Sequence, residues 1–291
     1  MKVINVCVDD HANFMWNIHK SLLTVGVDSY AYKLNPHPFN YPEQADIIKL
    51  DLLRTLEADI IFIHHSDWEL EKYFVDKIVY FHTGTKYRTR KETIRDMTKY
   101  AELNLVALPE FYNTGLAREH YVIGAVEEPK GAVGTEYKFG HFPSNPDVKG
   151  TDTIIKAFKD VGVPLTHSTD KVGYEEQLLR MQKAQMIVEL FNPMLGGNMY
   201  GSFGMTALEG ASYRKVVLTQ NVTGQELYKK TYGECELVIC NTYNELKNNI
   251  LKYNNIDVYE KANATYFWWQ SKHSPRATGE RIAELLSGVC R

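Results

Sequence analysis

Short runs rich in β-branched and aromatic residues alternate with longer stretches of helical periodicity along the whole chain of 291 residues. In the first half, this pattern predicts strands at 2–8, 29–33, 59–63, 77–82, 103–108 and 120–123. In the second half it predicts strands at 136–139, 163–167, 186–190, 216–219 and 236–239, with helices between most of them. Such alternation is typical of βαβ units and parallel sheets, so we expect an α/β protein.

One break in this rhythm divides the chain into two parts. Residues 124–135 show no periodicity and contain proline and glycine, which indicates a linker. A chain of 291 residues with 44% hydrophobic residues has enough interior for two modest cores. We therefore expect doubly wound, Rossmann-like domains at 1–125 and 126–270, facing a central cleft at the carboxyl ends of their strands. Helical stretches at 257–269 and 275–286 are expected to pack as a pair, and the C-terminal helix, residues 271–291, to pack back on the first domain.

Composition excludes several classes of protein. The net charge of −3 gives no overall attraction to nucleic acid or anionic lipid. No apolar run approaches the roughly 20 residues of a membrane span and no secretion signal is recognisable, so we expect a cytoplasmic protein. The 4 cysteines form no CxxC pair, and the adjacent His64 and His65 of an extended segment would point to opposite sides. We therefore expect no metal site and no resident cofactor.

A glycine-rich segment at residues 196–211 runs directly into a predicted helix at 203–212. Glycine permits positive φ and close backbone approach, and the first N–H groups of a helix lack intrahelical partners. This combination favours a bound phosphate or pyrophosphate. Glu209, one to two turns further on, could accept hydrogen bonds from two ribose hydroxyls. The alternative is an ordinary loop followed by an ordinary helical glutamate.

Other candidate residues lie where predicted strands end. Lys149 stands at the start of a predicted helix, where its ammonium group could neutralise a diphosphate leaving group. His141 lies in the preceding loop and could equally be a packing histidine. His82 ends the strand at 77–82 and is followed by a glycine turn, so we expect it at the edge of the cleft. A cationic cluster at 86–99 is either a solvated helix face or a site for an anionic group.

These segments together resemble the GT-B glycosyltransferases, in particular the retaining glycosyltransferase family 4, over nearly the whole chain. Residues 59–64 resemble the family's strand ending in histidine, and 79–84 its strand, histidine and glycine turn. Residues 140–158 resemble its block with a Lys-Gly pair, and 183–209 the segment that runs into its Glu-x7-Glu motif. The order of the motifs carries the resemblance.

The resemblance implies retaining transfer of a hexose or pentose from a nucleotide diphosphate sugar to an acceptor, without a metal. It places the donor on the second domain and the acceptor on the first. The acceptor's identity stays open among a glycan, a lipid, a protein, a small molecule and modified DNA. Catalytic roles are implied for His82, near the donor sugar, and Lys149, at the diphosphate. The donor-binding residues are expected to be Gly84, His141, Lys149, Val172, Gly173, Ser202, Phe203, Gly204, Met205, Thr206 and Glu209. The acceptor-binding candidates are Asp10, His11 and Arg88.

Three departures from the family pattern keep other functions open. Gly201 stands where the family has the first glutamate of its motif, His141 replaces an arginine, and residues 9–13 replace a Gly-Gly loop. A non-catalytic nucleotide-sugar-binding protein and a sugar-nucleotide epimerase are the alternatives. An NAD-dependent dehydrogenase is disfavoured, because no GxGxxG follows the first strand.

Overall fold

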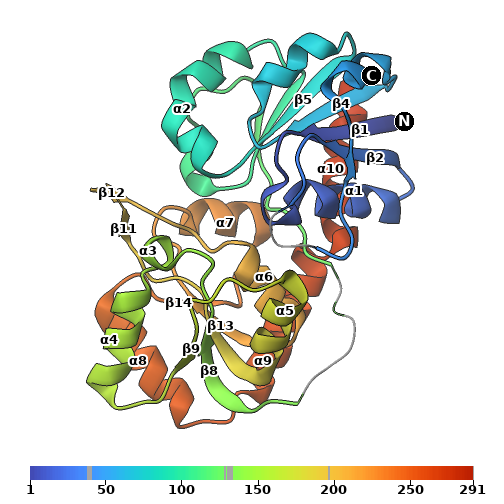
Figure 1. The fold of residues 1–291 in the computed structure, drawn as a ribbon. Coiled ribbons are helices and arrows are strands. Elements are labelled where there is room, and N and C mark those ends of the chain that lie inside the picture. The colour runs from blue at the N-terminus through green and yellow to red at the C-terminus, as the bar shows by residue number, and fades with distance from the viewer. Residues whose placement is uncertain (38–40, 128, 130–133, 196, 291) are drawn as a thin grey trace. The chain divides into compact units, whose positions relative to one another are not determined.

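The computed structural model describes residues 1–37, 41–127, 129, 134–195 and 197–290. The chain divides into two compact units, which we describe separately (Figure 1). Unit 1 comprises Met1–Glu127 and His273–Arg291, and unit 2 comprises Glu128–Lys272. Within the predicted linker at 124–135, residues 128 and 130–133 lie outside the described part, as does residue 196 of the glycine-rich segment.

Unit 1 is built on a seven-stranded parallel sheet with the strand order β3-β2-β1-β4-β5-β6-β7. The strands are β1 (Lys2–Cys7), β2 (Asp28–Lys33), β3 (Asp46–Ile47), β4 (Ile60–His64), β5 (Lys77–His82), β6 (Leu103–Val106) and β7 (Glu119–Tyr121). This is the Rossmann order, in which the direction of winding reverses between the first strand and the fourth. In unit 1 the reversal lies between β1 and β4.

Helices complete unit 1, and the C-terminal helix is among them. Its α-helices are α1 (Phe14–Thr24), α2 (Gly84–Met97) and α10 (Pro275–Cys290), and its 3-10 helices are η1 (His11–Asn13), η2 (Leu50–Thr55), η3 (Trp68–Tyr73) and η4 (Pro109–Phe111). Helix α10 packs on α1, which in turn packs on β1 and β2. A Cβ atom on Gly279 would lie 2.1 Å from the carbonyl oxygen of Ser21, so the glycine permits this close approach.

Unit 2 is built on a five-stranded parallel sheet with the order β14-β13-β10-β8-β9. The strands are β8 (Tyr137–His141), β9 (Thr166–His167), β10 (Ala184–Val188), β13 (Val216–Thr219) and β14 (Val238–Ile239), and a separate antiparallel pair is formed by β11 (Met194–Leu195) and β12 (Asn198–Met199). Counted along the chain, the sheet has the doubly wound order 2-1-3-4-5. Its reversal lies between β8 and β10.

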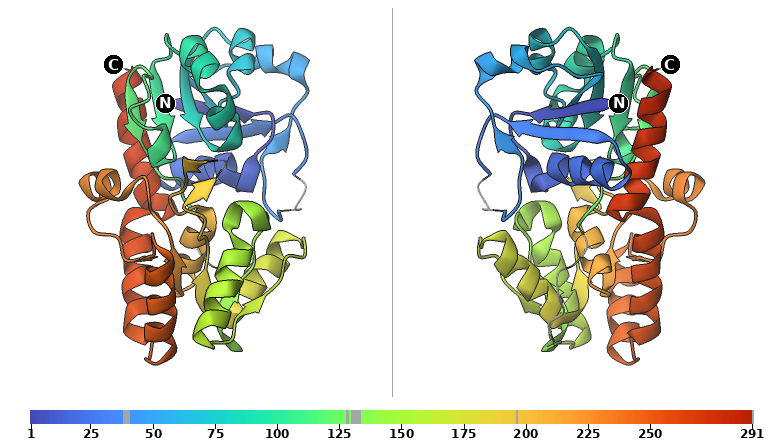
Figure 2. Two further views of the ribbon diagram at one scale, coloured as in Figure 1. Left: turned by 90° about the vertical axis from the view of Figure 1, so that its left-hand side faces the viewer. Right: turned by 90° about the vertical axis from the view of Figure 1, so that its right-hand side faces the viewer.

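Both faces of the second sheet are covered by helices, as the views in Figure 2 show. The helices are α3 (Pro146–Lys149), α4 (Thr151–Val161), α5 (Tyr174–Lys183), α6 (Met205–Ser212), α7 (Gln225–Tyr232), α8 (Tyr243–Asn254) and α9 (Tyr259–Lys272). Alternate strand residues point to opposite faces. Met186 and Val188 join the core with α4 and α8, whereas Ile187 lies near Gly210 of α6.

The predicted α/β class with two Rossmann-like domains is confirmed. The strands β5 and β13 have the predicted bounds, and the other predicted strands differ from the observed ones by a few residues. The short elements β3, β11, β12 and α3 were not predicted, and neither was α7. The expected pairing of the last two helices is wrong, because α9 packs on α6 and β13 in unit 2 while α10 packs on α1. Within the described residues, no helix has both the length and the apolar character needed to cross a membrane.

Candidate functional site

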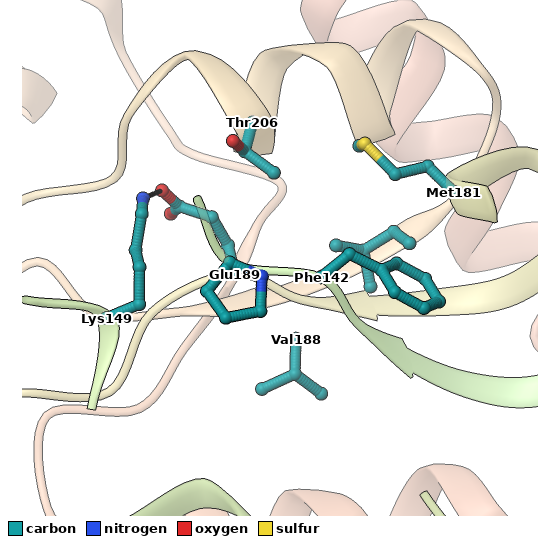
Figure 3. A pocket seen from close by; sticks show the side chains of 8 residues that line it. Phe142, Lys149, Met181, Val188, Glu189 and Thr206 are labelled. Atoms are coloured by element: carbon teal, nitrogen blue, oxygen red, sulfur yellow. Dashed lines mark hydrogen bonds and ion pairs between the residues drawn. The ribbon is translucent and has the colours of Figure 1, made fainter. Parts of the chain in front are cut away.

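The reversal of strand order in unit 2 coincides with a pocket. Open α/β sheets bind ligands beyond the carboxyl ends of the strands at such a switch point. Strand β8 is followed by the segment carrying Lys149, and β10 by Glu189. The pocket leaves about 250 Å³ free of protein atoms, part of it open to solvent, and is lined by Phe142, Pro143, Lys149, Met181, Ile187, Val188, Glu189 and Thr206. Figure 3 shows Lys149 and Glu189 meeting on one side of it, with Phe142 and Met181 on the other.

His141 supports this pocket from within the sheet. Its side chain is fully buried. The Nδ1–H group donates to the carbonyl oxygen of Val188 at 2.7 Å, and Nε2 accepts from Thr151 Oγ1 at 2.9 Å. Burial lowers the pKa of His141 to about 4, against a smaller opposing effect of the Val188 bond, so the ring is neutral at pH 7. Both nitrogens are therefore used in joining β8 to β10 and to the start of α4.

Lys149 is held in place by the backbone on either side of it. Gly150 has φ +70°, and a Cβ atom there would lie 2.0 Å from the carbonyl oxygen of Phe191. The amide of Phe191 donates to the carbonyl oxygen of Lys149 at 3.1 Å. Only glycine permits this conformation and this approach at position 150. The Lys-Gly pair therefore fixes the lysine beside the segment that follows β10.

Glu189 is a site residue that the sequence analysis missed. Its fully buried carboxylate forms an ion pair with Lys149, with 2.6 Å between Nζ and Oε1. The same Oε1 accepts from the amide of Gly204 at 3.2 Å, and Oε2 accepts from Thr219 Oγ1 at 2.6 Å. The available signal was one charged residue following an apolar strand, in the sequence Met-Ile-Val-Glu-Leu-Phe. Such residues are rarely buried without a partner.

The amino end of α6 lies at the same place. Gly204 is the N-cap residue and provides no side-chain cap. The amides of Met205 and Thr206 belong to the first turn, where N–H groups have no acceptor within the helix. Ser202 is 7% exposed, and its Oγ has no hydrogen-bond partner within the described part of the chain. A buried hydroxyl in this state indicates a position where a ligand or water would bind.

Phe203 anchors the entry into this helix. Its ring is buried and meets Tyr228 and Trp268 with centroid distances of 5.4 and 6.1 Å. Trp268 Nε1 donates to Tyr228 Oη at 2.9 Å, which fixes both partners. The side chain of Phe203 therefore packs in an aromatic cluster of unit 2, and only its backbone is available for a ligand.

The predicted ribose and base residues lie on neighbouring segments. Glu209, partly exposed on α6, accepts a hydrogen bond from Tyr174 at the start of α5. Val172 and Gly173 directly precede Tyr174. Burial raises the pKa of Glu209 to about 7, although the Tyr174 hydrogen bond and the positive charge of Lys149 oppose this shift. The structure thus brings Glu209 close to the loop that was expected beside the base.

Gly201 has no room for a side chain. It has φ +94°, and an added Cβ atom would lie 2.2 Å from Gln220 Nε2. Gln220 donates to the carbonyl oxygens of Asn192 and Tyr200 at 3.0 and 2.6 Å. Its Oε1 accepts from the amide of Asn192 at 2.6 Å. In this chain the buried amide of Gln220 organises the loop, and a glutamate at position 201 would displace it.

His82 is enclosed within unit 1. Its side chain is fully buried, Nδ1 pairs with Ser66 Oγ at 3.0 Å and Nε2 with Asn104 Oδ1 at 2.9 Å. The backbone oxygen of His82 accepts from the amide of Ala107 at 3.1 Å. Burial lowers its pKa to about 4, against a smaller opposing effect of Asn104. This geometry leaves His82 no free nitrogen for a donor sugar.

The switch point of unit 1 carries a second polar cluster. Asp10 accepts from the amides of Met15 and Trp16 at 2.7 and 3.0 Å, so it caps the start of α1. His65 Nε2 lies 3.2 Å from Asp10 Oδ1, and its Nδ1 lies 2.6 Å from Thr83 Oγ1. Asp10 is thus buried and fully engaged, unlike an exposed acceptor ligand. His65 and Thr83 were not predicted as part of a site.

The exposed His11 contacts this cluster edge-on, with its ring centroid 5.4 Å from that of His65. Partial desolvation of its ring, followed by the charge of His65, lowers the pKa of His11. Ligand atoms of Cys7, Asp10 and His65 lie within 4.8 Å of one another. Burial raises the pKa of the Cys7 thiol well above its usual value.

The first cations of the cluster on α2 are paired with carboxylates. Lys86 Nζ lies 2.8 Å from Asp67 Oδ1 and 2.7 Å from Glu69 Oε2. Arg88 Nη2 lies 2.7 Å from Glu110 Oε1. At the first turns of α2 these contacts favour a solvated, internally neutralised helix face over a strongly attractive anion site. Gly84 begins this helix with φ +65°, and an added Cβ atom there would meet nothing within 4 Å.

Known proteins match this chain over its whole length in structure, but not in sequence. No family model matches it, and no curated protein matches its sequence. The structure of Anabaena HepE in complex with UDP and glucose matches with a TM-score of 0.72 and 12% identity, covering 99% of both chains. Sucrose-phosphate synthase from Thermosynechococcus elongatus matches with a TM-score of 0.65 and 11% identity, also covering 99% of both chains. The UDP-GlcNAc 2-epimerase of Methanocaldococcus jannaschii, in complex with UDP-GlcNAc and UDP, matches with a TM-score of 0.54 and 12% identity. The match covers 99% of this chain and 100% of the epimerase.

Likeness at 11–12% identity shows the fold alone. The strand orders of both units and the match over 99% of HepE and of sucrose-phosphate synthase agree on that fold. The chain is an α/β protein with the GT-B fold, built from two Rossmann-like units.

Proposed function

We propose that this chain is a glycosyltransferase that moves a sugar from a nucleotide diphosphate sugar to an acceptor. The observation that carries the proposal is the position of Lys149 beside the amino end of α6, at the switch point of unit 2. A helix amino end with a nearby lysine favours a bound diphosphate. The match to HepE, whose structure contains UDP and glucose, supports the proposal.

In this proposal the donor occupies the switch point of unit 2. Lys149 and the amides of residues 203–206 bind the diphosphate, and the buried hydroxyl of Ser202 is available beside them. Glu209 accepts hydrogen bonds from the ribose, and Val172 and Gly173 lie beside the base. The acceptor binds to unit 1, where His11 and Arg88 are the accessible candidates among the residues predicted for it. The acceptor's identity stays open.

The proposed reaction retains the configuration of the sugar, as in glycosyltransferase family 4. The bond from the anomeric carbon to the diphosphate oxygen breaks, and its electron pair leaves with the phosphate. The acceptor hydroxyl bonds to the same face of that carbon, and its proton passes to the departing phosphate oxygen. Lys149 and the amides stabilise the growing negative charge, so neither a metal nor a protein nucleophile is required.

Replacement of Lys149 tests this role. Lys149→Ala is expected to lower the rate of nucleoside diphosphate release from UDP-glucose or another donor by about 10²-fold. Lys159→Ala, which removes an exposed lysine from α4 of the same unit, is the control and should leave the rate unchanged. An undiminished rate in Lys149→Ala would exclude the lysine from the reaction.

Replacement of Glu209 tests the nucleotide site itself. Glu209→Ala is expected to weaken nucleoside diphosphate binding in calorimetry by on the order of tenfold, since two charge-assisted hydrogen bonds to the ribose are lost. Titration with uridine, guanosine, adenosine and cytidine diphosphates identifies the base. An unaltered dissociation constant for the preferred nucleotide would remove Glu209 from the site.

Two alternative functions each have an observation in their favour. The match to UDP-GlcNAc 2-epimerase favours an epimerase, which would change the sugar without transferring it. The closed geometry at Gly201 favours a non-catalytic binding protein, which would bind nucleotide but release no nucleoside diphosphate from a donor. Analysis of both products of a donor incubation, the nucleotide and the sugar, separates the three functions.

A further inference from the structure

The carboxylate of Glu189 lies beside the position where the donor's diphosphate is proposed to bind. Lys149 Nζ lies 2.6 Å from its Oε1, and the amide of Gly204 donates to the same oxygen at 3.2 Å. These are two of the groups that the proposed function assigns to the diphosphate. An anion of the protein itself therefore already holds them.

The carboxylate cannot easily leave this position. Its side chain has no exposed surface, and its second oxygen accepts from Thr219 Oγ1 at 2.6 Å. Oε1 lies 3.2 Å from where a Cβ atom of Gly204 would be, so a side chain at position 204 would press on the ion pair. Lys149 is different, because 19% of its side chain is exposed and its ammonium group has three donors. The ammonium group of Lys149 can donate to two anions at once, whereas the carboxylate of Glu189 stays in its position.

We propose that Glu189 is a built-in competitor of the donor's diphosphate, and that its fixed negative charge lowers the affinity of unit 2 for nucleoside diphosphates. This inference rests on the proposed function. A diphosphate bound to Lys149 and the amino end of α6 lies within a few ångströms of a carboxylate that water does not screen, and like charges in such surroundings repel strongly. The same repulsion weakens binding of the nucleoside diphosphate product and speeds its release.

The opposite role for Glu189 makes the opposite prediction. A carboxylate that served only to orient Lys149 would strengthen diphosphate binding, because a lysine held in place loses less conformational freedom when the ligand binds. Replacing Glu189 would then weaken binding. The sign of the change in affinity therefore separates competition from orientation.

The test is calorimetric titration of UDP, GDP, ADP and CDP into the full chain and into Glu189→Gln. Glutamine keeps the shape, and its amide oxygen can still accept from Lys149 and Gly204. We expect the preferred nucleotide to bind on the order of tenfold or more tightly to Glu189→Gln. The inhibition constant of that nucleotide, measured as a product inhibitor of Glu189→Gln, should fall by the same factor. The donor KM should fall without a rise in kcat.

Two further variants complete the design. Glu234→Gln removes one negative charge from an exposed ion pair of unit 2 with Lys229 and is expected to leave affinity unchanged. Glu189→Met has a side chain of similar length and no charge, and is also expected to tighten binding. It replaces the glutamine variant if that variant does not fold.

The outcomes distinguish the inference from the function on which it rests. If the unaltered chain binds a nucleoside diphosphate and Lys149→Ala weakens that binding, but Glu189→Gln binds equally or less tightly, the competition is refuted and the site stands. If neither the unaltered chain nor Glu189→Gln binds any of the four nucleotides, the proposed function fails and the inference with it.

Discussion

Replacement of Gly201 by alanine is expected to lower the free energy of unfolding more than most substitutions in unit 2 that add one methyl group. A non-glycine residue at positive φ costs about 1–2 kcal/mol. The new Cβ atom would lie 2.2 Å from Gln220 Nε2, so that amide must move. Its displacement breaks the two hydrogen bonds it donates and the one it accepts, each worth about 1 kcal/mol. The expected loss in free energy of unfolding is therefore about 4 kcal/mol.

Urea unfolding followed by tryptophan fluorescence measures this loss, with Gly162→Ala as the matched control. Gly162 also has positive φ, at +68°, but an added Cβ atom there meets nothing within 4 Å, so only about 1 kcal/mol should be lost. In a double-mutant cycle, Gln220→Ala should remove most of the extra cost of Gly201→Ala. The reasoning is refuted if the two glycine variants lose equal stability at equal m values. By the same geometry, Gly201→Glu should destabilise unit 2 and not increase donor hydrolysis.

Three further predictions concern pH and helix capping. His82 and His141 have pKa values of about 4 in the fold and near 6.5 when unfolded. The free energy of unfolding should therefore be at its full value above pH 6.5 and fall by about 2 kcal/mol per histidine between pH 7 and pH 5. Urea unfolding at each pH measures this loss. If the carboxylate form of Glu209 binds the ribose, affinity for UDP-glucose should rise as the pH passes upward through about 7, and Glu209→Gln should abolish that rise in calorimetry. Asp10→Ala removes the cap of α1 and should cost about 2 kcal/mol in the same unfolding assay, and a loss below about 0.5 kcal/mol would contradict that role.

The fold was largely predictable because its strong signals are local. The strand at residues 77–82 and the strand at 216–219 have the predicted bounds, since an apolar β-branched run within a parallel sheet is buried on both faces. Elements of two to four residues, such as β11, β12 and α3, are too short to show a period. The last two helices were wrongly paired because helical periodicity in a sequence does not say which apolar surface a helix covers.

The candidate site was less predictable, because it depends on tertiary contacts. Glu209 could be proposed from its spacing after the glycine-rich segment, and Lys149 from its place at the start of a predicted helix. The partner of Lys149 could not, since Glu189 is 40 residues away in sequence and reaches the lysine only because β8 and β10 are neighbours. His82 ends its predicted strand, whereas His141 was expected in a loop and instead ends β8. Burial and hydrogen bonds to neighbouring strands make both histidines structural parts of their sheets.

The position of a bound nucleoside diphosphate in a crystal structure of this chain tests the proposed site most directly. A diphosphate oxygen is expected at hydrogen-bond distance, roughly 2.7–3.2 Å, from Lys149 Nζ, with the other phosphate oxygens at the amides that begin α6. A nucleotide bound elsewhere, with Lys149 still paired to Glu189 alone, would contradict it.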